Sequence, residues 1–333
     1  MSEEQRKKET SFADGVQFAY GPVPSRRLGK SLGINNIPAK VCSYACIYCQ
    51  VGSTTRLSID RASFYDPLAI VDAVKHKIGA AGAAAEPIDY LTFVPDGEPT
   101  LDRHLIDELS MLKSAGVPLG IITNGSLAWR ADVSAALGMA DWVSLKIDAV
   151  DESVWRRINR PHKALRLGTI LDGVLRFARA FTGFLVTETM LVNGVNDRPA
   201  TLEATSAFLA DVRPRTAYLS VPSRPPAEKW VRAPDEETLN RAFHQFTERA
   251  LQVEYLIGDE GNAFASTGDV EKDLLGITAV HPMRREAVEL FLSRAGASWD
   301  VVDRLVAGGA LVEAQHAGQL FYLRRCTAAR ARP

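Results

Sequence analysis

The feature that most constrains the fold is a regular alternation of apolar, β-branched runs with helix-like stretches from residue 33 to about residue 260. One helix-like stretch, 66–78, opens with Asp66 as an N-cap and Pro67 at the first helical position. Strands that alternate with helices predict βαβ units and a parallel sheet. The candidate strands are 32–37, 88–94, 118–124, 141–147, 183–191 and 216–221.

Six such units predict an α/β fold, a partial (βα)6 barrel, although a doubly wound open sheet has the same periodicity. In barrels, catalytic residues follow the carboxyl ends of the strands. Each polar or glycine-rich segment of this region comes directly after a candidate strand, so we expect these segments to share one site. They are the cysteine-rich loop after residue 37, then 95–101, 123–127, 145–149, 192–197 and 222–226.

The loop after the first candidate strand holds three of the four cysteines, Cys42, Cys46 and Cys49, in a CxxxCxxC pattern. A structural zinc site requires a second ligand pair, which is absent. A disulfide would leave an odd thiol. Thiolates are the usual ligands of iron–sulfur clusters, so the triad predicts a 4Fe–4S cluster with one iron open to chemistry. In the alternative, Cys326 is the fourth ligand, and the protein is then an electron carrier. Cys326, however, belongs to a segment whose pattern indicates a separate module.

This spacing, with the aromatic Tyr48 before the last cysteine, resembles the radical S-adenosylmethionine (radical SAM) superfamily. The resemblance implies that the amino and carboxylate groups of SAM chelate the open iron. It also implies that an electron from the reduced cluster cleaves SAM to methionine and a 5′-deoxyadenosyl radical. The expected cofactors are therefore a 4Fe–4S cluster and SAM, and the expected partner is an external electron donor such as a flavodoxin or ferredoxin.

By the same resemblance, "DGEPTL" after the second strand stands at the superfamily's SAM-binding motif, with Asp96 where glycine is usual. Glu98 and backbone carbonyls would accept hydrogen bonds from the SAM ammonium, and Gly97 would allow close backbone approach. An ordinary Pro-Asp-Gly turn is the alternative. The cofactor-binding residues expected by this analogy are Tyr48, Asp96, Gly97, Glu98, Thr123, Asn124, Ser126, Asn193, Val221 and Pro222.

The fourth candidate strand carries Ser144, Lys146 and Asp148 on one face. Polar groups in a buried strand are costly unless they are paired. A Lys146–Asp148 ion pair would satisfy this requirement. The functional alternative places Lys146 near the methionine carboxylate or Asp148 near the substrate, which makes both of them candidate catalytic residues.

Two basic clusters, 24–33 and 154–168, flank the barrel motifs. Such clusters are either solvated surfaces or docking sites for an anionic substrate such as a nucleic acid, and we expect the two to share one rim. The net charge of −1 argues against a uniformly basic nucleic-acid binder. The basic residues are Arg26, Arg27, Lys30, Arg156, Arg157, Arg160, His162, Lys163 and Arg166.

Residues 20–52, together with "FVPDGEPTL", "RINRPH" and "HPMRREAV", resemble the iron–sulfur oxidoreductases related to the wyosine-forming tRNA enzymes. The wyosine enzymes hold a second cluster through cysteines upstream of the triad, whereas no cysteine precedes Cys42 here. The substrate therefore stays open between RNA, a protein and a small metabolite. A non-catalytic iron–sulfur electron-transfer or regulatory protein is the alternative class.

The predicted domains are a tail (1–19), the barrel (20–262), a linker (263–280), a winged-helix-like module (281–326) and a tail (327–333). Two amphipathic helices and a hairpin around Ala317–Gly318 suggest the module, which would bind nucleic acid, a protein or the barrel itself. No apolar run reaches the roughly 18 residues of a membrane span, and the charged N-terminus lacks a signal core. We therefore expect a cytoplasmic protein with no membrane contact.

Overall fold

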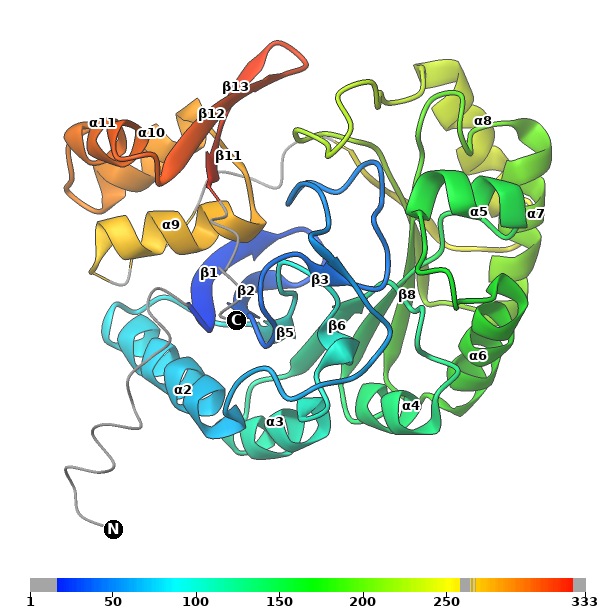
Figure 1. Ribbon diagram of the computed structural model, residues 1–333, viewed down its shortest axis with the longest axis horizontal. Coiled ribbons are helices and arrows are strands. Elements are labelled where there is room, and N and C mark those ends of the chain that lie inside the picture. The colour runs from blue at the N-terminus through cyan, green and yellow to red at the C-terminus, as the bar shows by residue number, and fades with distance from the viewer. Residues whose placement is uncertain (1–16, 258–263, 265, 267, 326–333) are drawn as a thin grey trace.

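The computed structural model describes residues 17–257, 264, 266 and 268–325 (Figure 1). Its main element is an eight-stranded sheet in the order β1-β2-β5-β6-β7-β8-β9-β10. β1 is antiparallel to β2, and all the other neighbours are parallel. The strands are β1 (Ala19–Ser25), β2 (Gly29–Ile34), β5 (Tyr90–Phe93), β6 (Leu119–Thr123), β7 (Trp142–Lys146), β8 (Phe184–Met190), β9 (Thr216–Ser220) and β10 (Val253–Leu256).

All six predicted strands are present, as β2 and β5 to β9, and they follow chain order across the sheet without reversal. This order confirms the partial barrel over the doubly wound sheet. The helices between the strands surround the curved sheet (Figure 1). They are α2 (Pro67–Ala83), α3 (Leu105–Leu112), α4 (Ala131–Leu137), α5 (Glu152–Asn159), α6 (Leu167–Ala180), α7 (Pro199–Val212) and α8 (Glu236–Thr247), with short 3-10 turns η1 (Pro99–Leu101) and η2 (Lys113–Ala115).

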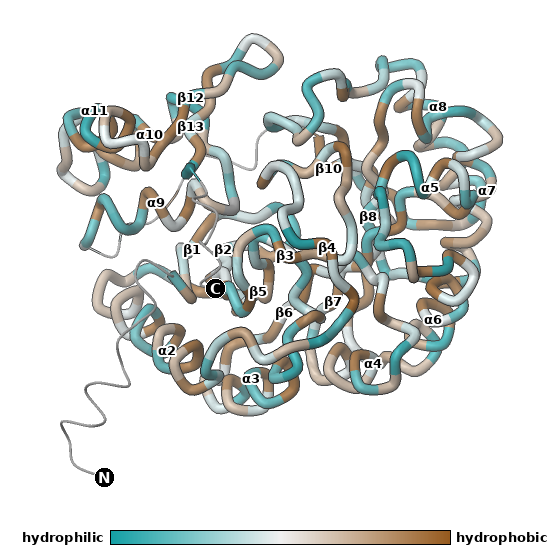
Figure 2. The backbone as a smooth tube through the Cα atoms, viewed as in Figure 1, coloured by the Kyte–Doolittle hydropathy of each residue, from teal (hydrophilic) through white to brown (hydrophobic). Residues whose placement is uncertain are grey.

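Local sequence accounts for these elements. The carboxylate of Asp66 accepts a hydrogen bond from the Leu68 backbone N–H at 3.0 Å, and Pro67 begins α2, as expected of an N-cap. Hydrophobic and hydrophilic segments alternate along α2, α3, α4 and α6 in Figure 2. The apolar faces of these helices and the fully buried residues of the strands, such as Leu91, Ile121 and Val143, form the main core. None of the helices in the described part of the chain is long and apolar enough to span a bilayer.

A second core lies in the C-terminal module, residues 270–324. It consists of α9 (Val270–Val280), β11 (Met283–Arg284), α10 (Arg285–Arg294), α11 (Asp300–Ala307), β12 (Leu311–His316) and β13 (Gln319–Arg324), with the sheet order β11-β13-β12. Ala317 and Gly318 both have positive φ, as a two-residue hairpin turn requires. The prediction of a linker over 263–280 is wrong, because α9 occupies most of that range and its Leu274 and Ile277 belong to this core.

The C-terminal module is fixed to the barrel at the β1 edge of the sheet. Lys77 of α2 and Asp273 of α9 form an ion pair at 2.6 Å, and their side chains are 10% and 2% exposed. Val23 of β1 packs against the core of the module. The buried ion pair joins α9 to α2, and removing one partner of such a pair is strongly destabilising. α9 also packs against β1, so it covers the edge strand of the sheet.

Candidate active site

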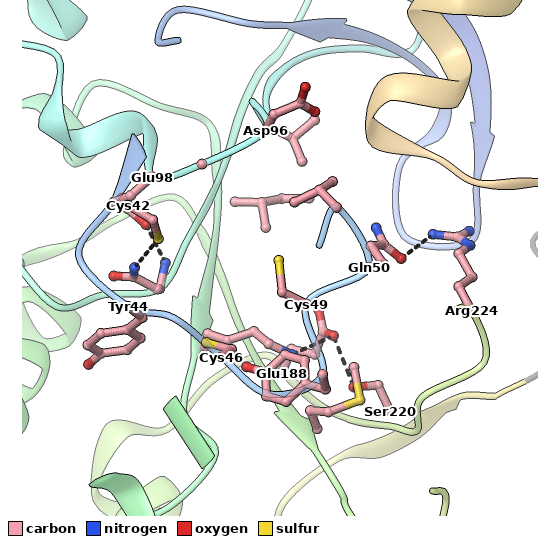
Figure 3. A pocket seen from close by; sticks show the side chains of 18 of the residues that line it. Cys42, Tyr44, Cys46, Cys49, Gln50, Asp96, Glu98, Glu188, Ser220 and Arg224 are labelled. Atoms are coloured by element: carbon pink, nitrogen blue, oxygen red, sulfur yellow. Dashed lines mark hydrogen bonds and ion pairs between the residues drawn. The ribbon is translucent and has the colours of Figure 1, made fainter. Parts of the chain in front are cut away.

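A cavity of about 290 Å³ opens where the parallel strands end (Figure 3). Residues from the carboxyl ends of β7 and β8, and residues that follow β2, β5, β6 and β9, contribute to its wall, as the barrel topology requires. Of the residues predicted from the sequence, the wall contains Cys42, Cys46, Cys49, Tyr48, Asp96, Gly97, Glu98, Thr123, Asn124, Lys146, Val221 and Pro222.

The cysteine loop is held by backbone pairing on two sides. Cys42 ends β3 (Val41–Cys42), which pairs in parallel with β4 (Arg56–Leu57). On the other side, the loop pairs with the end of α5 and the segment after it. The N–H of Ala45 donates to the Asn159 carbonyl at 3.0 Å, and the N–H of His162 donates to the Ser43 carbonyl at 2.9 Å. This pairing fixes the loop with its three thiols toward the cavity.

The turn after β5 is bound to the start of the cysteine loop. The Lys40 N–H donates to the Asp96 carbonyl at 2.8 Å, and the Glu98 N–H donates to the Val41 carbonyl at 3.1 Å. A Cβ atom on Gly97 would lie 2.1 Å from the Val41 carbonyl oxygen. Any side chain at Gly97 would therefore separate the two motifs, which is the close approach expected from the sequence.

Glu98 is 1% exposed, and its carboxylate accepts four hydrogen bonds from the protein. Two come from Thr100, from the hydroxyl at 2.5 Å and the N–H at 3.1 Å, and the Thr123 hydroxyl donates at 2.6 Å. The fourth comes from the Asn124 N–H at 2.8 Å. Burial raises the pKa of Glu98, and these donors oppose the shift. The carboxylate thus ties the end of β5 to the end of β6, so its acceptor sites are largely used within the protein.

Asp96 differs from Glu98 in having spare acceptor capacity. It is 4% exposed and lies on the cavity wall, and its Oδ1 has no hydrogen-bond partner among the described residues. Burial raises the pKa of Asp96 to about 6, against the opposing charges of Lys40 and Arg324. A buried carboxylate oxygen without a donor is costly, so Asp96 is suited to receive a donor group from a ligand.

Asn124 connects the β6 end to the first cysteine. Its Nδ2 donates to the Ser43 hydroxyl at 2.8 Å and lies 3.5 Å from Cys42 Sγ. Ser126 is fully buried behind this contact, with its hydroxyl 2.7 Å from that of Ser43. Ser126 is therefore not on the cavity wall, and it supports the loop rather than facing a ligand.

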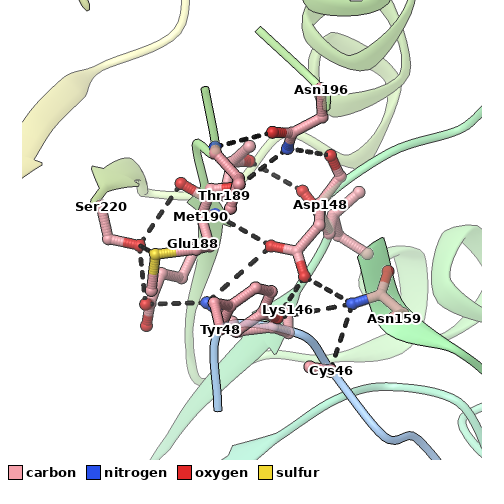
Figure 4. A network of polar contacts seen from close by, with 12 residues as sticks. Cys46, Tyr48, Lys146, Asp148, Asn159, Glu188, Thr189, Met190, Asn196 and Ser220 are labelled. Atoms are coloured by element: carbon pink, nitrogen blue, oxygen red, sulfur yellow. Dashed lines mark hydrogen bonds and ion pairs between the residues drawn. The ribbon is translucent and has the colours of Figure 1, made fainter. Parts of the chain in front are cut away.

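Asp148 is 3% exposed and lies behind Cys46 rather than on the wall (Figure 4). It accepts hydrogen bonds from the Tyr48 hydroxyl, from Asn159 Nδ2 at 2.7 Å and from the Met190 N–H at 2.8 Å. Asn159 Nδ2 also lies 3.4 Å from Cys46 Sγ. Asp148 thus orients Tyr48 and Asn159 around the second cysteine.

Lys146 lies on the cavity wall, and its main partner is Glu188, which the sequence analysis missed. Its Nζ is 2.9 Å from Glu188 and 3.8 Å from Asp148, so the predicted Lys146–Asp148 pair is the longer contact. Burial opposes the charge on Lys146, but the two carboxylates outweigh it and raise the pKa of the ammonium. Glu188 also pairs with Arg27 at 2.7 Å. An acidic residue at the carboxyl end of the apolar run 184–190 was the available signal.

The structure does not bring every predicted residue to the cavity. Asn193 is exposed and makes a backbone hydrogen bond to Arg232 at 3.0 Å. Asn196, three residues later, is the buried asparagine, and its Nδ2 donates to the Asp148 carbonyl at 2.8 Å. Of the two basic clusters, only the first reaches the wall, through Arg26 and Arg27, whereas no residue of 154–168 lines it.

The donor set fits an iron–sulfur cluster. Among the described residues, no three Cys, His, Asp or Glu side chains converge on a single ion. A cube binds each thiolate through a different iron, so its ligands need not converge. Amide N–H groups directed at two of the sulfurs also suit cluster ligands. Burial raises the pKa of all three thiols, that of Cys46 to about 12, so ligation would release protons. Cys326 lies outside the described residues.

The fold is a partial barrel, and the loop that carries the three thiols lies at the carboxyl ends of its strands, where barrel enzymes have their active sites. The particular family follows from comparison with known proteins. The chain belongs to the radical SAM superfamily, whose family model matches residues 36–204, and it is a radical SAM enzyme. Membership implies a 4Fe–4S cluster and SAM.

Individual relatives agree with this assignment. A UPF0026 protein of Methanocaldococcus jannaschii is 45% identical over 311 residues, which cover 93% of this chain and 96% of that protein. Among solved structures, TYW1 with a lysine-pyruvate adduct bound has a TM-score of 0.52 at 17% identity, over 66% of this chain and 73% of that one. A radical SAM methyltransferase from Sphaerobacter thermophilus also scores 0.52, at 16% identity, over 68% and 67%. These two likenesses show the fold.

Proposed function

We propose that this protein binds a 4Fe–4S cluster through Cys42, Cys46 and Cys49 and abstracts hydrogen from a substrate held in the cavity. The observation that carries the proposal is that the three thiols share one wall with Asp96, whose Oδ1 has no donor among the described residues, and with the cation of Lys146. When bound, the cluster supplies the electron that splits SAM into methionine and a 5′-deoxyadenosyl radical.

Different residues of the site have different roles in binding SAM and the substrate. Asp96 accepts a hydrogen bond from the SAM ammonium, because its Oδ1 has no donor within the described protein. Glu98 holds Thr123 and Asn124 in place instead of binding SAM directly. Lys146 stays protonated and presents a cation to the cavity for a carboxylate of SAM or of the substrate. Val221 and Pro222 lie on the wall where the adenine is expected.

Anaerobic reconstitution followed by a SAM-cleavage assay tests this function. With dithionite as reductant, the protein should release 5′-deoxyadenosine, and Cys46→Ala should abolish both the cluster absorbance and the product. Cys326→Ala is the matched control and should retain both. Cluster loss in Cys326→Ala, or a bound cluster without SAM cleavage, would contradict the proposal.

Asp96→Asn tests the SAM site. The substitution keeps the shape and removes the charge, so we expect SAM affinity to fall roughly tenfold to a hundredfold by calorimetry, with cluster content unchanged. This range corresponds to the loss of one charged hydrogen bond, about 1.5–3 kcal/mol. Unchanged affinity would remove Asp96 from the site.

We further propose that the C-terminal module is a winged helix that restricts the mouth of the cavity. Its order of helix, strand, two helices and two strands supports the assignment. His316 Nε2 lies 3.1 Å from the Pro222 carbonyl, and Arg224 links Gln50 at 2.8 Å to His281 at 3.0 Å. Exposed acidic residues on α11, Asp300 and Asp303, disfavour nucleic acid as its ligand. Bulk tRNA added to the SAM-cleavage assay tests an RNA substrate directly.

A further inference from the structure

We propose that the outer face of the cysteine loop is the docking surface for an acidic protein that carries one electron. The surface, called here the outer loop face, consists of Arg56, Leu57, Pro161, His162 and Lys163. The inference rests on the proposed function, because reductive cleavage of SAM requires an electron from outside the chain. The reduced carrier loses one electron, the cluster gains it, and its transfer to SAM breaks one carbon–sulfur bond.

The outer loop face lies directly against the cysteine loop. In β4, Arg56 and Leu57 are the register partners of Val41 and Cys42. The Ser58 N–H donates to the Cys42 carbonyl at 2.9 Å, which continues this pairing. One extended segment therefore stands beside the first cysteine, so a carrier docked there would be close to the cluster.

On its second side, the cysteine loop likewise pairs with a single extended segment. Pro161 forms a β-bridge with Tyr44, and the His162 N–H donates to the Ser43 carbonyl at 2.9 Å. Tyr44 also accepts a hydrogen bond from the Thr54 hydroxyl at 2.8 Å, just before β4. Both parts of the outer loop face thus attach to residues 42–44 and lie on either side of the same short stretch.

The chemistry of this face suits an acidic partner. Leu57 is 39% exposed and places an apolar side chain at the surface beside the loop. Arg56 and Lys163 are exposed, and within the part of the chain that the structure describes their side chains have no hydrogen-bond or ion-pair partner. An exposed apolar side chain with one cation beside it and another across the loop fits the small, weakly bound interfaces of electron-transfer proteins, and opposite charge on the carrier would steer the encounter.

The position of this face excludes a direct role in substrate binding. None of its five residues lines the cavity, whereas all three cysteines do. A macromolecular substrate docked on the outer loop face would have the cysteine loop between its reacting atom and the cavity. An electron carrier has no such constraint, because its task ends at the cluster. Within the basic segment 154–168, His162 and Lys163 are thereby assigned to electron entry rather than to an anionic substrate, whereas Arg156 and Arg160 form ion pairs with Glu152 and Glu228.

The test compares two reductants on the reconstituted full-length protein. We expect R56E/K163E to lower the initial rate of 5′-deoxyadenosine formation about tenfold at low salt with reduced flavodoxin or plant-type ferredoxin, the scale of lost electrostatic steering. With dithionite, the rate should equal that of the parent. The matched control is K113E/R213E, which makes the same change of charge at exposed positions at the C-terminal ends of outer helices and should behave as the parent in both assays.

Any other result would contradict the proposal, and each such result has its own meaning. An equal loss with both reductants would mean that Arg56 and Lys163 support the cysteine loop rather than bind a carrier. Parent-like rates with the carrier would mean that electrons enter elsewhere. Loss of RNA binding in R56E/K163E with unchanged carrier-dependent rates would assign the face to nucleic acid. Failure of the parent itself to cleave SAM with dithionite would refute the proposed function, which distinguishes that failure from a failure of the docking surface.

Discussion

The two flanks of the cysteine loop are built alike. On the first flank, buried Glu98 accepts a hydrogen bond from the backbone of Asn124, whose side chain donates toward Cys42. On the second flank, buried Asp148 accepts a hydrogen bond from the side chain of Asn159, which also donates toward Cys46. In both cases a carboxylate near the carboxyl end of a strand orients an asparagine amide toward a sulfur. Two cysteines are thereby positioned by the same combination of groups.

The flanks differ in how they compensate buried charge. All four donors to Glu98 are neutral, and burial raises its pKa. The second flank includes cations, because Lys146 lies between Asp148 and Glu188, and Arg27 pairs with Glu188 as well. The first flank therefore depends on directional hydrogen bonds, and the second depends on a balance of charges that pH can disturb.

The largest effect is expected from removing the hydrogen-bonded carboxylate of the first flank. Glu98→Leu leaves the Thr100, Thr123 and Asn124 donors without their acceptor, and each unsatisfied buried donor costs about 1–3 kcal/mol. We expect the free energy of unfolding to fall by about 4 kcal/mol in anaerobic denaturant titrations. Glu98→Gln retains one acceptor oxygen and should lose less than half of that. Equal losses for the two variants would show that the donors do not hold the flank.

The charge-balanced flank should respond to pH instead. Burial opposes the charge of Glu188, but Lys146 and Arg27 outweigh it and lower its pKa to about 2. Because this pKa is below the unfolded value of about 4.3, the ionised carboxylate stabilises the fold above pH 4.3 by about 3 kcal/mol. That contribution is lost as the pH falls from about 4.3 to 2. Denaturant titrations should therefore show Glu188→Gln less stable than the parent at pH 7, with the difference shrinking in that window. A difference independent of pH would exclude the ion pairs as its cause.

How much of the fold and of the site can be predicted from the sequence depends on how far apart the contacting residues lie along the chain. The cysteine loop, the Asp96–Glu98 turn and the six strands follow from local patterns, and their loops gather because parallel strands bring their carboxyl ends to one edge. The order of the strands does not follow, because a doubly wound sheet has the same periodicity. Local patterns do not reveal the roles of Glu188 and Asn159, because Glu188 pairs with Arg27 and Asn159 contacts Cys46, and only the closed sheet brings these distant parts of the chain together. Periodicity within one segment does not predict α9, because its apolar face is buried by the C-terminal module and by β1.

The hydrogen-bond donors to the Glu98 carboxylate could not be predicted from the sequence either. A carboxylate after a strand suggested a ligand contact, yet the threonines that occupy it are ordinary residues of the following turn and of β6. Which of two neighbouring carboxylates has a free oxygen depends on the donors that the fold brings to each of them. That geometry assigns the open acceptor to Asp96, at the position where the resemblance to the superfamily is weakest.

The smallest expected effect is a change in the reduction potential of the cluster when Asn124 or Asn159 is replaced. Hydrogen bonds to cluster sulfurs stabilise the reduced, more negative state, so removing one should make the reduction potential more negative. For Asn124→Ala we expect a shift of about 40 mV, since about 1 kcal/mol for one hydrogen bond converts to that value for one electron.

Asn159→Ala should shift the potential further in the same direction, because it also leaves the Asp148 carboxylate beside Cys46 without its 2.7 Å donor. Redox titrations followed by electron paramagnetic resonance measure both shifts, and exposed Asn193→Ala is the control with none. Equal shifts at the two positions would mean that the charge of Asp148 is already neutralised by Lys146. The two flanks would then differ in the interactions that stabilise them but not in their effect on the reduction potential of the cluster.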